Sequence, residues 1–262
     1  MAEGTTPDFA SKPRDGAVRW SDLLIAFFGG SFAGVVLSVL VGGAALLIAV
    51  AMGFRLNGGG FVGCIQNSFW VNQAAIVLSD LGLLATIWLV ARWRTPHPVR
   101  HYFPPLAAST LALAALSGVA LSLLLNGGNE LLARASLVTF RDSAVERALV
   151  PHSAAQFAAS LAVVALFAPL VEEFFFRGLF YAWLRRSRSV GVAVCVTALA
   201  FALGHGHFLL HPGAQGWLYT SELALAGVVL ALWVARTGSL WASFATHAAY
   251  NAVAIAFSVL LP

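Results

Sequence analysis

Long apolar runs separated by short polar segments dominate the chain. Seven of them come close to or exceed the about 20 residues that an α-helix needs to cross a bilayer. They cover approximately residues 21–53, 71–91, 105–125, 155–184, 190–206, 217–235 and 239–261. The runs are continuously apolar and lack the alternation of membrane β-strands. The pattern therefore predicts an all-α fold, a polytopic membrane helical bundle of about seven transmembrane helices.

Composition supports this class. Of the 262 residues, 60% are hydrophobic and 10% are charged, and the mean hydropathy is +0.84. Soluble domains carry roughly 25% charged residues. No hydrophilic segment is long enough for a second domain, so we expect a cytoplasmic polar tail over 1–20 and one membrane domain over 21–262. The two cysteines, Cys64 and Cys195, provide no disulfide framework or metal-ligand spacing.

The basic residues predict an orientation. Ten Lys and Arg fall in the tail and in loops on one face, against four on the other, namely Arg55, Arg134, Arg141 and Arg147. The positive-inside rule then places the N-terminus in the cytoplasm and the C-terminus outside. We therefore attribute the net charge of +4 to membrane orientation and expect the lipid bilayer, not nucleic acid, as a partner. The Arg- and Ala-rich composition favours a bacterial inner membrane.

The segment 127–153 is the longest polar connection between the later spans. It begins next to an Asn-Gly-Gly sequence that favours a turn, and it mixes leucines with charged residues. Two interpretations remain open: a solvated connector, or an amphipathic helix lying on the outer surface.

The fourth run contains three charged residues, Glu172, Glu173 and Arg177. A charge at the centre of a bilayer span costs roughly 2.5–3.5 kcal/mol, so such residues are functional candidates. Glu173 and Arg177 are four residues apart on one helix face, in the favourable order for an ion pair. Glu172 points about 100° away from Glu173 and needs a partner from another helix. Pro169 predicts a kink just before the acidic pair.

Three other acids lie in or near the spans. Asp22 starts the first one, where a role at the helix N-terminus is expected. Asp80 lies deeper in the second, and the sequence offers it no partner. Glu222 lies near the outer end of the sixth and is compatible with an interfacial position.

Two further helices carry polar pairs with a spacing of four residues. The fifth run ends in Phe201-x-x-x-His205, and the seventh contains His247-x-x-x-Asn251. At about 1.5 Å per residue from the cytoplasmic ends, Glu172, His205 and Asn251 lie about 20–24 Å deep, and His247 about 14 Å. This similarity predicts a shared site. The structural alternative is interhelical hydrogen bonding, worth about 0.6–2 kcal/mol.

Carboxylate, imidazole and amide side chains that share a site can together hydrolyse a peptide bond. A carboxylate and a histidine can take a proton from water and make it a nucleophile for a peptide carbonyl. A histidine and an asparagine amide can donate hydrogen bonds to the resulting oxyanion, each worth about 2.7–4 kcal/mol. Alternatively, Glu172, His205 and His247 could hold a divalent metal such as zinc. The His-Glu-x-x-His motif is absent, so the spacing does not demand a metal.

Three motifs, in this order on successive helices, resemble those of the CPBP family: Glu172-Glu173-x-x-x-Arg177, Phe201-x-x-x-His205 and His247-x-x-x-Asn251. This family contains the CAAX prenyl endopeptidases of the Ras-converting type and the bacterial bacteriocin-processing or immunity (Abi) proteins. The resemblance covers about residues 150–257. It implies an intramembrane endopeptidase with a membrane-associated peptide or protein as its substrate.

The resemblance also implies roles for these residues. Glu172 and His205 would activate water, and His247 and Asn251 would hold the oxyanion. The supporting residues would be Glu173, Arg177 and Phe201. Both a metal-dependent mechanism and a metal-free glutamate mechanism, which needs no cofactor, are compatible with the family.

His207 and His211 follow the second motif, and we interpret them as loop residues, although His207 could take the place of His205. Two other functions use the same residues. A proton-coupled transporter would also place Glu, His and Arg in the membrane, but no inverted repeat is visible. A scaffold or immunity protein would keep the protease fold without turnover.

Overall fold

The structure, a computed structural model, describes residues 18–51, 67–94, 99–211 and 213–260. Within these ranges every regular element is helical, and seven helical runs are long and apolar enough to cross a membrane. The predicted all-α fold and number of spans are therefore confirmed. Cys64 and Arg55 lie outside the described residues.

The seven runs follow the predicted order. They are α1 (Trp20–Leu24) with η1 (Ile25–Gly29) and α2 (Gly30–Ala51); α4 (Phe69–Arg94); α5 (Ala108–Arg134); α7 (Ala154–Ser160) with η3 (Leu161–Phe167), α8 (Ala168–Glu173), η4 (Phe174–Tyr181) and α9 (Ala182–Arg185); α10 (Val190–Gly204) with α11 (His207–Leu210); α12 (Ala214–Thr237); and α13 (Leu240–Leu260). Among the described residues, the short helices η2 (Val99–Tyr102) and α6 (Ala144–Leu149) lie in connections between these runs. The stretches η1, η3 and η4 are π-helical.

The predicted end of the third span is wrong. The Asn-Gly-Gly sequence at 126–128 does not turn, and α5 continues to Arg134. The Asn126 amide donates hydrogen bonds to the carbonyl and the hydroxyl of Ser122 one turn earlier, and Asn129 donates to Glu222 of α12 at 3.1 Å. These contacts stabilise the helix against its weak local propensity. The polar connection therefore shortens to residues 135–153, with α6 as its short helix.

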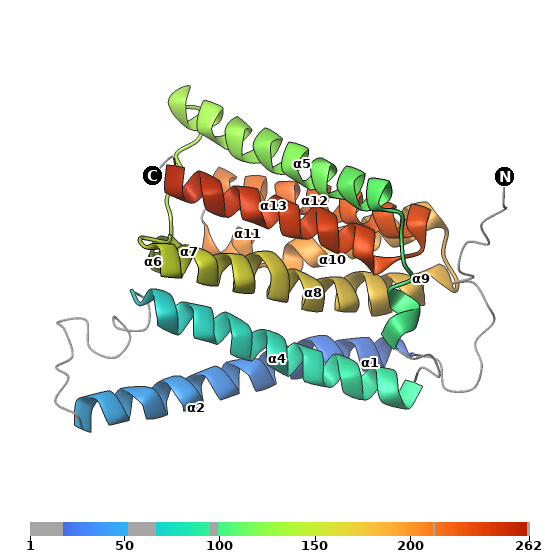
Figure 1. Ribbon diagram of the computed structural model, residues 1–262, viewed down its shortest axis with the longest axis horizontal. Coiled ribbons are helices and arrows are strands. Elements are labelled where there is room, and N and C mark those ends of the chain that lie inside the picture. Colours follow the sequence, from blue (N-terminus) through green and yellow to red (C-terminus); the bar gives the residue numbers. More distant parts are fainter. Residues whose placement is uncertain (1–17, 52–66, 95–98, 212, 261–262) are drawn as a thin grey trace.

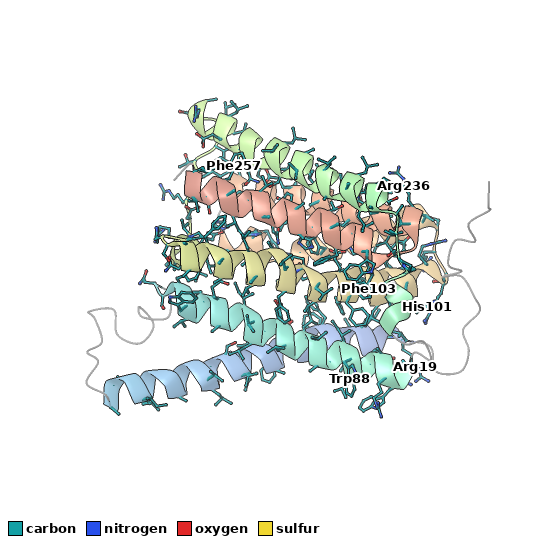
Figure 2. The ribbon with its side chains drawn as sticks, in the orientation of Figure 1. Arg19, Trp88, His101, Phe103, Arg236 and Phe257 are labelled. Atoms are coloured by element: carbon teal, nitrogen blue, oxygen red, sulfur yellow. The ribbon has the colours of Figure 1, made fainter. Side chains whose placement is uncertain are left out.

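The helices lie side by side along the long axis of the molecule (Figure 1). In this view α2 and α4 form one edge and α5 the other, with the α7–α9 run and α13 between them. Arg19 and Arg236 lie near one end of the bundle and Phe257 near the other (Figure 2). At the former end, Arg94 pairs with buried Asp22, Nε to Oδ2 3.1 Å, which agrees with the first-turn role expected for this acid.

Glycines allow close helix crossings, among them one between α2 and α4 and one between α5 and α13. A Cβ on Gly34 of α2 would collide with the backbone of Ser79 in α4, and a Cβ on Gly118 of α5 would collide with the carbonyl of Thr246 in α13. Small residues let membrane helices approach closely where no hydrophobic force drives them together. The second crossing holds α5 against the turn of α13 that carries His247.

An aromatic cluster fills the centre of the bundle. Phe27 stacks on Phe175 with ring centroids 5.3 Å apart, and Phe176 meets Phe201 edge-to-face at 5.2 Å. Phe175, Phe176 and Phe201 are buried. This packing joins η1, η4 and α10. It therefore holds in place the end of α10, which His205 directly follows.

Candidate active site

Glu173 and Arg177 form a fully buried ion pair at the centre of the α7–α9 run. Arg177 Nη1 lies 2.9 Å from Glu173 Oε1, and Arg177 Nη2 donates to the Gly227 carbonyl of α12 at 3.2 Å. The guanidinium carbon lies 4.5 Å from the ring centroid of Phe201. The i,i+4 pairing predicted from the sequence is therefore present, and it joins three helices. Buried charges persist only with such partners.

The same carboxylate holds a histidine, a contact that the sequence reasoning missed. His247 Nδ1 lies 2.9 Å from Glu173 Oε1, and the Ser243 hydroxyl donates to Glu173 Oε2. Because an ionised carboxylate only accepts hydrogen bonds, His247 carries a proton on Nδ1. Its Nε2 is thereby turned toward Glu172, 3.8 Å from Oε2.

His205 is oriented by a similar device on the opposite side of Glu172. Its Nδ1 lies 2.8 Å from the Phe201 carbonyl one turn earlier. A carbonyl oxygen accepts only, so Nδ1 donates and Nε2 is directed toward Glu172. That Nε2 lies 4.0 Å from Glu172 Oε2. Two imidazoles from different helices therefore face one carboxylate.

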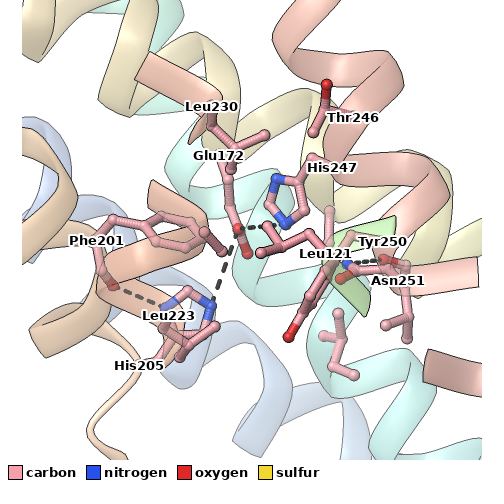
Figure 3. A pocket seen from close by; sticks show the side chains of 14 residues that line it. Leu121, Glu172, Phe201, His205, Leu223, Leu230, Thr246, His247, Tyr250 and Asn251 are labelled. Carbon is pink, nitrogen blue, oxygen red and sulfur yellow. Dashed lines mark hydrogen bonds and ion pairs between the residues drawn. The ribbon is translucent and has the colours of Figure 1, made fainter. Parts of the chain in front are cut away.

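These groups line a cavity of about 320 Å³ between the helices (Figure 3). Its polar wall comprises Glu172, His205, Thr246, His247, Tyr250 and Asn251. The 3.8 and 4.0 Å separations are too long for direct hydrogen bonds and suit a water that bridges each pair of atoms from the side. The Glu172 side chain is 21% exposed and that of His205 31%, so both reach the cavity.

Asn251 lies on the same wall, one turn beyond His247 (Figure 3). Its Nδ2 donates to the Val164 carbonyl of η3 at 2.8 Å. The amide nitrogen carries two hydrogens, so one N–H remains for a ligand. The four predicted catalytic residues thus meet at one cavity, as their similar depths indicated, while Glu173 and Arg177 lie buried behind it.

His207 does not compete with His205 for this position. It is absent from the cavity lining, and its ring packs against His211 and Tyr219, with centroids 5.6 and 5.5 Å away. The turn at Gly206, with φ of 69°, redirects the chain between the two histidines.

Residues 154–253 match the family model of the Rce1-like type II CAAX prenyl endopeptidases. This match confirms the family resemblance. It supports a CAAX-type intramembrane protease in general terms. The Rce1-like segment, residues 154–253, contains every residue of the three motifs. No curated protein and no solved structure matched the chain in the corresponding comparisons.

Helices outside the Rce1-like segment complete the cavity. Ile76 of α4 and Leu121 of α5 line it. Asp80, one turn beyond Ile76, has a buried Oδ2 with no hydrogen-bond partner in the described part of the chain. Ile76 and Leu121 are ordinary apolar residues, so their place in the cavity could not be predicted from the sequence. Glu222 is half-buried against Asn129.

The donor types of Glu172, His205 and His247 would suit zinc, but their arrangement does not gather them around one point. A tetrahedral zinc ion holds neighbouring ligand atoms about 3.3–3.6 Å apart. Here each imidazole nitrogen lies 3.8 or 4.0 Å from Glu172 Oε2, but the ligand atoms of the three residues do not all lie within 4.8 Å of one another. The described residues contain one group of three whose ligand atoms all lie within 4.8 Å of one another, and it is a different group.

Proposed function

We propose that this protein is an intramembrane endopeptidase that hydrolyses peptide bonds of membrane-associated substrates, with Glu172 as the general base. The observation that carries this proposal is the position of Glu172 in the cavity, between the Nε2 atoms of His205 and His247 at 4.0 and 3.8 Å. The Rce1-like match to residues 154–253 supports the reaction class.

In the proposed reaction, a water held between Glu172 and His205 attacks the peptide carbonyl carbon. Glu172 takes a proton from this water as the new carbon–oxygen bond forms, and the carbonyl electron pair moves to oxygen. General base catalysis of this kind contributes roughly 10²–10⁴-fold to a rate. The proton then passes to the leaving amine as the carbon–nitrogen bond breaks.

The oxyanion is stabilised by His247 and by the second N–H of Asn251. His247 can donate from Nε2 only when both ring nitrogens are protonated, because Nδ1–H is held by Glu173. The buried Glu173 carboxylate accepts the hydrogen bond from Nδ1 and so fixes the direction of Nε2. Glu173 and Arg177 are therefore positioning residues that act through His247, and no step passes through a metal.

We infer that the end of the bundle with Arg19, Arg94 and Arg236 faces the cytoplasm of a bacterial inner membrane. The chain then begins inside and α13 ends outside. This orientation rests on the excess of Lys and Arg in the loops of that face. The cavity would lie within the bilayer, open to substrates that are themselves embedded in or attached to the membrane.

The test compares membrane peptides from cells that contain the native protein with those from cells that contain Glu172→Gln. Peptides that depend on the native protein should disappear with the variant, although the variant remains folded and extractable. Purified protein is then assayed on a prenylated CAAX peptide and on its unprenylated counterpart. Equal cleavage by the native protein and Glu172→Gln would overturn the proposal.

A further inference from the structure

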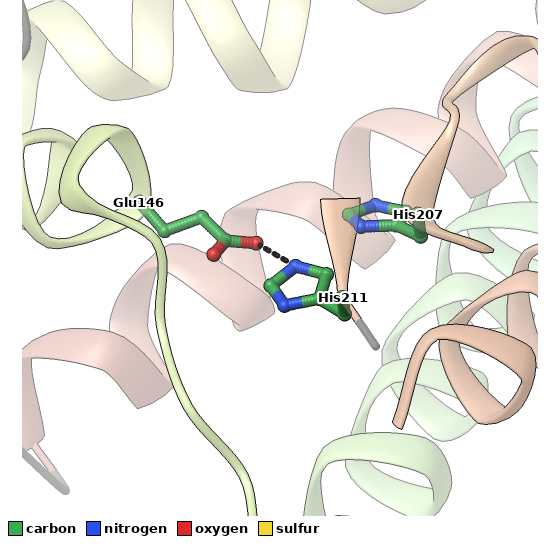
Figure 4. Close-up of side chains that lie close together, drawn as sticks. All are labelled: Glu146, His207 and His211. Carbon is green, nitrogen blue, oxygen red and sulfur yellow. Dashed lines mark hydrogen bonds and ion pairs between the residues drawn. The ribbon is translucent and has the colours of Figure 1, made fainter. Parts of the chain in front are cut away.

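A second group of ionisable side chains lies outside the catalytic cavity, where α6 meets the turn around α11. It consists of Glu146, His207 and His211, called here the Glu146 cluster (Figure 4). One ligand atom from each residue lies within 4.8 Å of the other two. Glu146 stands outside the Rce1-like segment, so the family match does not account for the cluster.

Local structure positions all three side chains. The backbone N–H of His211 donates to the carbonyl of His207 at 2.9 Å, which closes one helical turn and places both rings on one face. Ser143 and Glu146 form a reciprocal capping box, in which the Ser143 N–H donates to Glu146 Oε2 at 2.7 Å. The other carboxylate oxygen, Oε1, lies 3.0 Å from His211 Nε2.

The surroundings leave the cluster short of hydrogen-bond partners. His207 Nδ1 is buried without a partner among the described residues. His211 is only 3% exposed, and both histidine rings meet Tyr219 edge-on, with centroids 5.5 and 5.3 Å away. A buried imidazole nitrogen without a partner is unfavourable, and a metal ion is one group that satisfies it.

We propose that Glu146, His207 and His211 bind a divalent transition-metal ion, most favourably Zn²⁺. Two imidazoles and one carboxylate are a common ligand set for zinc and leave a fourth position for water. Imidazole ligands disfavour Mg²⁺ and Ca²⁺, which prefer oxygen. The Glu146–His211 separation of 3.0 Å is already close to the spacing of zinc ligands, and a ligand atom of His207 lies within 4.8 Å of both residues. Any proton on His211 Nε2 leaves that atom as the metal–nitrogen bond forms.

The ion would act as a clamp beside the active site. The segment before α6 is already attached to α12, because the Arg141 N–H donates to Gln215 Oε1 at 3.0 Å and Gln215 Nε2 donates to the Arg141 carbonyl at 3.1 Å. A metal would join α6 to α11 as well. The His207 ring stacks 6.3 Å from His205, so the clamp would restrain the turn that carries a catalytic residue.

Zinc binding by the full-length protein tests the proposal. The purified protein is stripped with a chelator and titrated with Zn²⁺ in competition with a chromophoric chelator. Glu146→Gln and His211→Ala should each lose one equivalent of bound zinc or bind it at least about tenfold more weakly. Glu172→Gln should retain that equivalent, since it alters only the cavity. Unchanged zinc binding in Glu146→Gln and His211→Ala, or its loss in Glu172→Gln alone, would overturn the proposal.

Folding is separated from binding by two further measurements. The thermal unfolding temperature of the native protein should rise with Zn²⁺ and not with Mg²⁺, and this rise should disappear in Glu146→Gln. Glu146→His supplies a third imidazole in place of the carboxylate and should restore both the rise and the lost equivalent. A Zn²⁺-induced rise of the same size in Glu146→Gln as in the native protein would contradict the clamp.

Discussion

Two groups of histidines and glutamates lie close together in this molecule, with His205 in one and His207 in the other. In the cavity, Glu172 stands between two imidazoles at 3.8 and 4.0 Å, and each imidazole is held from behind by an acceptor at 2.8 or 2.9 Å. In the Glu146 cluster, a carboxylate and an imidazole are in contact at 3.0 Å, and one buried nitrogen has no partner among the described residues. The first spacing suits a reacting water, and the second suits an ion. The two groups therefore contain the same side-chain types in different arrangements, which are set by the groups that orient them.

Replacement of each of the two neighbouring histidines by glutamine should have the largest effects. His205→Gln removes the imidazole facing Glu172, and cleavage should fall roughly 10²–10⁴-fold. His207→Gln should keep cleavage within a few-fold of native and lose zinc instead. Peptide cleavage and zinc stoichiometry, measured on both variants, provide the check. Loss of cleavage in His207→Gln alone would reverse the two assignments.

Replacement of Asn251 tests its proposed role as a hydrogen-bond donor to the oxyanion. Asn251→Ala removes both the contact to the Val164 carbonyl and the remaining N–H. Loss of one oxyanion donor should lower kcat roughly 10²–10³-fold with little change in KM. Steady-state kinetics on a cleaved peptide provide the measurement. A change confined to KM would indicate a role in substrate binding.

Replacement of Glu173 tests whether this residue stabilises the buried network that positions His247. Glu173→Gln leaves Arg177 buried without its counter-ion, so we expect a loss of about 3–5 kcal/mol in unfolding free energy as well as weaker catalysis. Thermal or denaturant unfolding in detergent measures it. Glu130→Gln, which alters an exposed pair with Arg134 at 2.6 Å, is the matched control and should change stability by at most about 1 kcal/mol. Equal stability of the two variants would contradict the buried network.

Removal of bound metal with a chelator should have the smallest effect on cleavage. If the reaction passes through Glu172 and water, stripping the metal should lower cleavage less than about tenfold, through the clamp alone, and Zn²⁺ should restore it. Elemental analysis of the stripped enzyme accompanies the assay. Complete loss of cleavage that only Zn²⁺ restores would favour a metal at Glu172, His205 and His247.

Sequence patterns predicted the parts of this architecture that depend on local geometry. Run lengths predicted the spans, a spacing of four residues predicted the Glu173–Arg177 pair, and depth along the helices predicted that Glu172, His205 and Asn251 meet. The bond from His247 to Glu173 was missed, because it depends on how α13 is rotated against α8. The end of α5 was misjudged because contacts with α12 outweigh the weak helix propensity of Asn-Gly-Gly.

The Glu146 cluster could not be predicted from the sequence either. Glu146 and His211 are 65 residues apart in the chain, and neither belongs to a motif with metal-ligand spacing. We interpreted His207 and His211 as loop residues, but His207 begins the short helix α11 and His211 directly follows its last residue. Without a third ligand, a pair of histidines spaced by four residues does not predict a metal site. Only the docking of the segment before α6 onto α12 brings that partner into reach.

The crossing at Gly118 has a practical consequence for anyone who wishes to shorten this protein. Thr246 donates through its hydroxyl to the Ala114 carbonyl at 2.8 Å, directly beside the position where α5 touches the backbone of α13. Expression of residues 154–253 alone would strip this support from the helix that carries His247 and would open the cavity where Ile76 and Leu121 close it. The family match therefore covers the residues that we propose as catalytic, and a truncated version that keeps only residues 154–253 should lack a stable cavity.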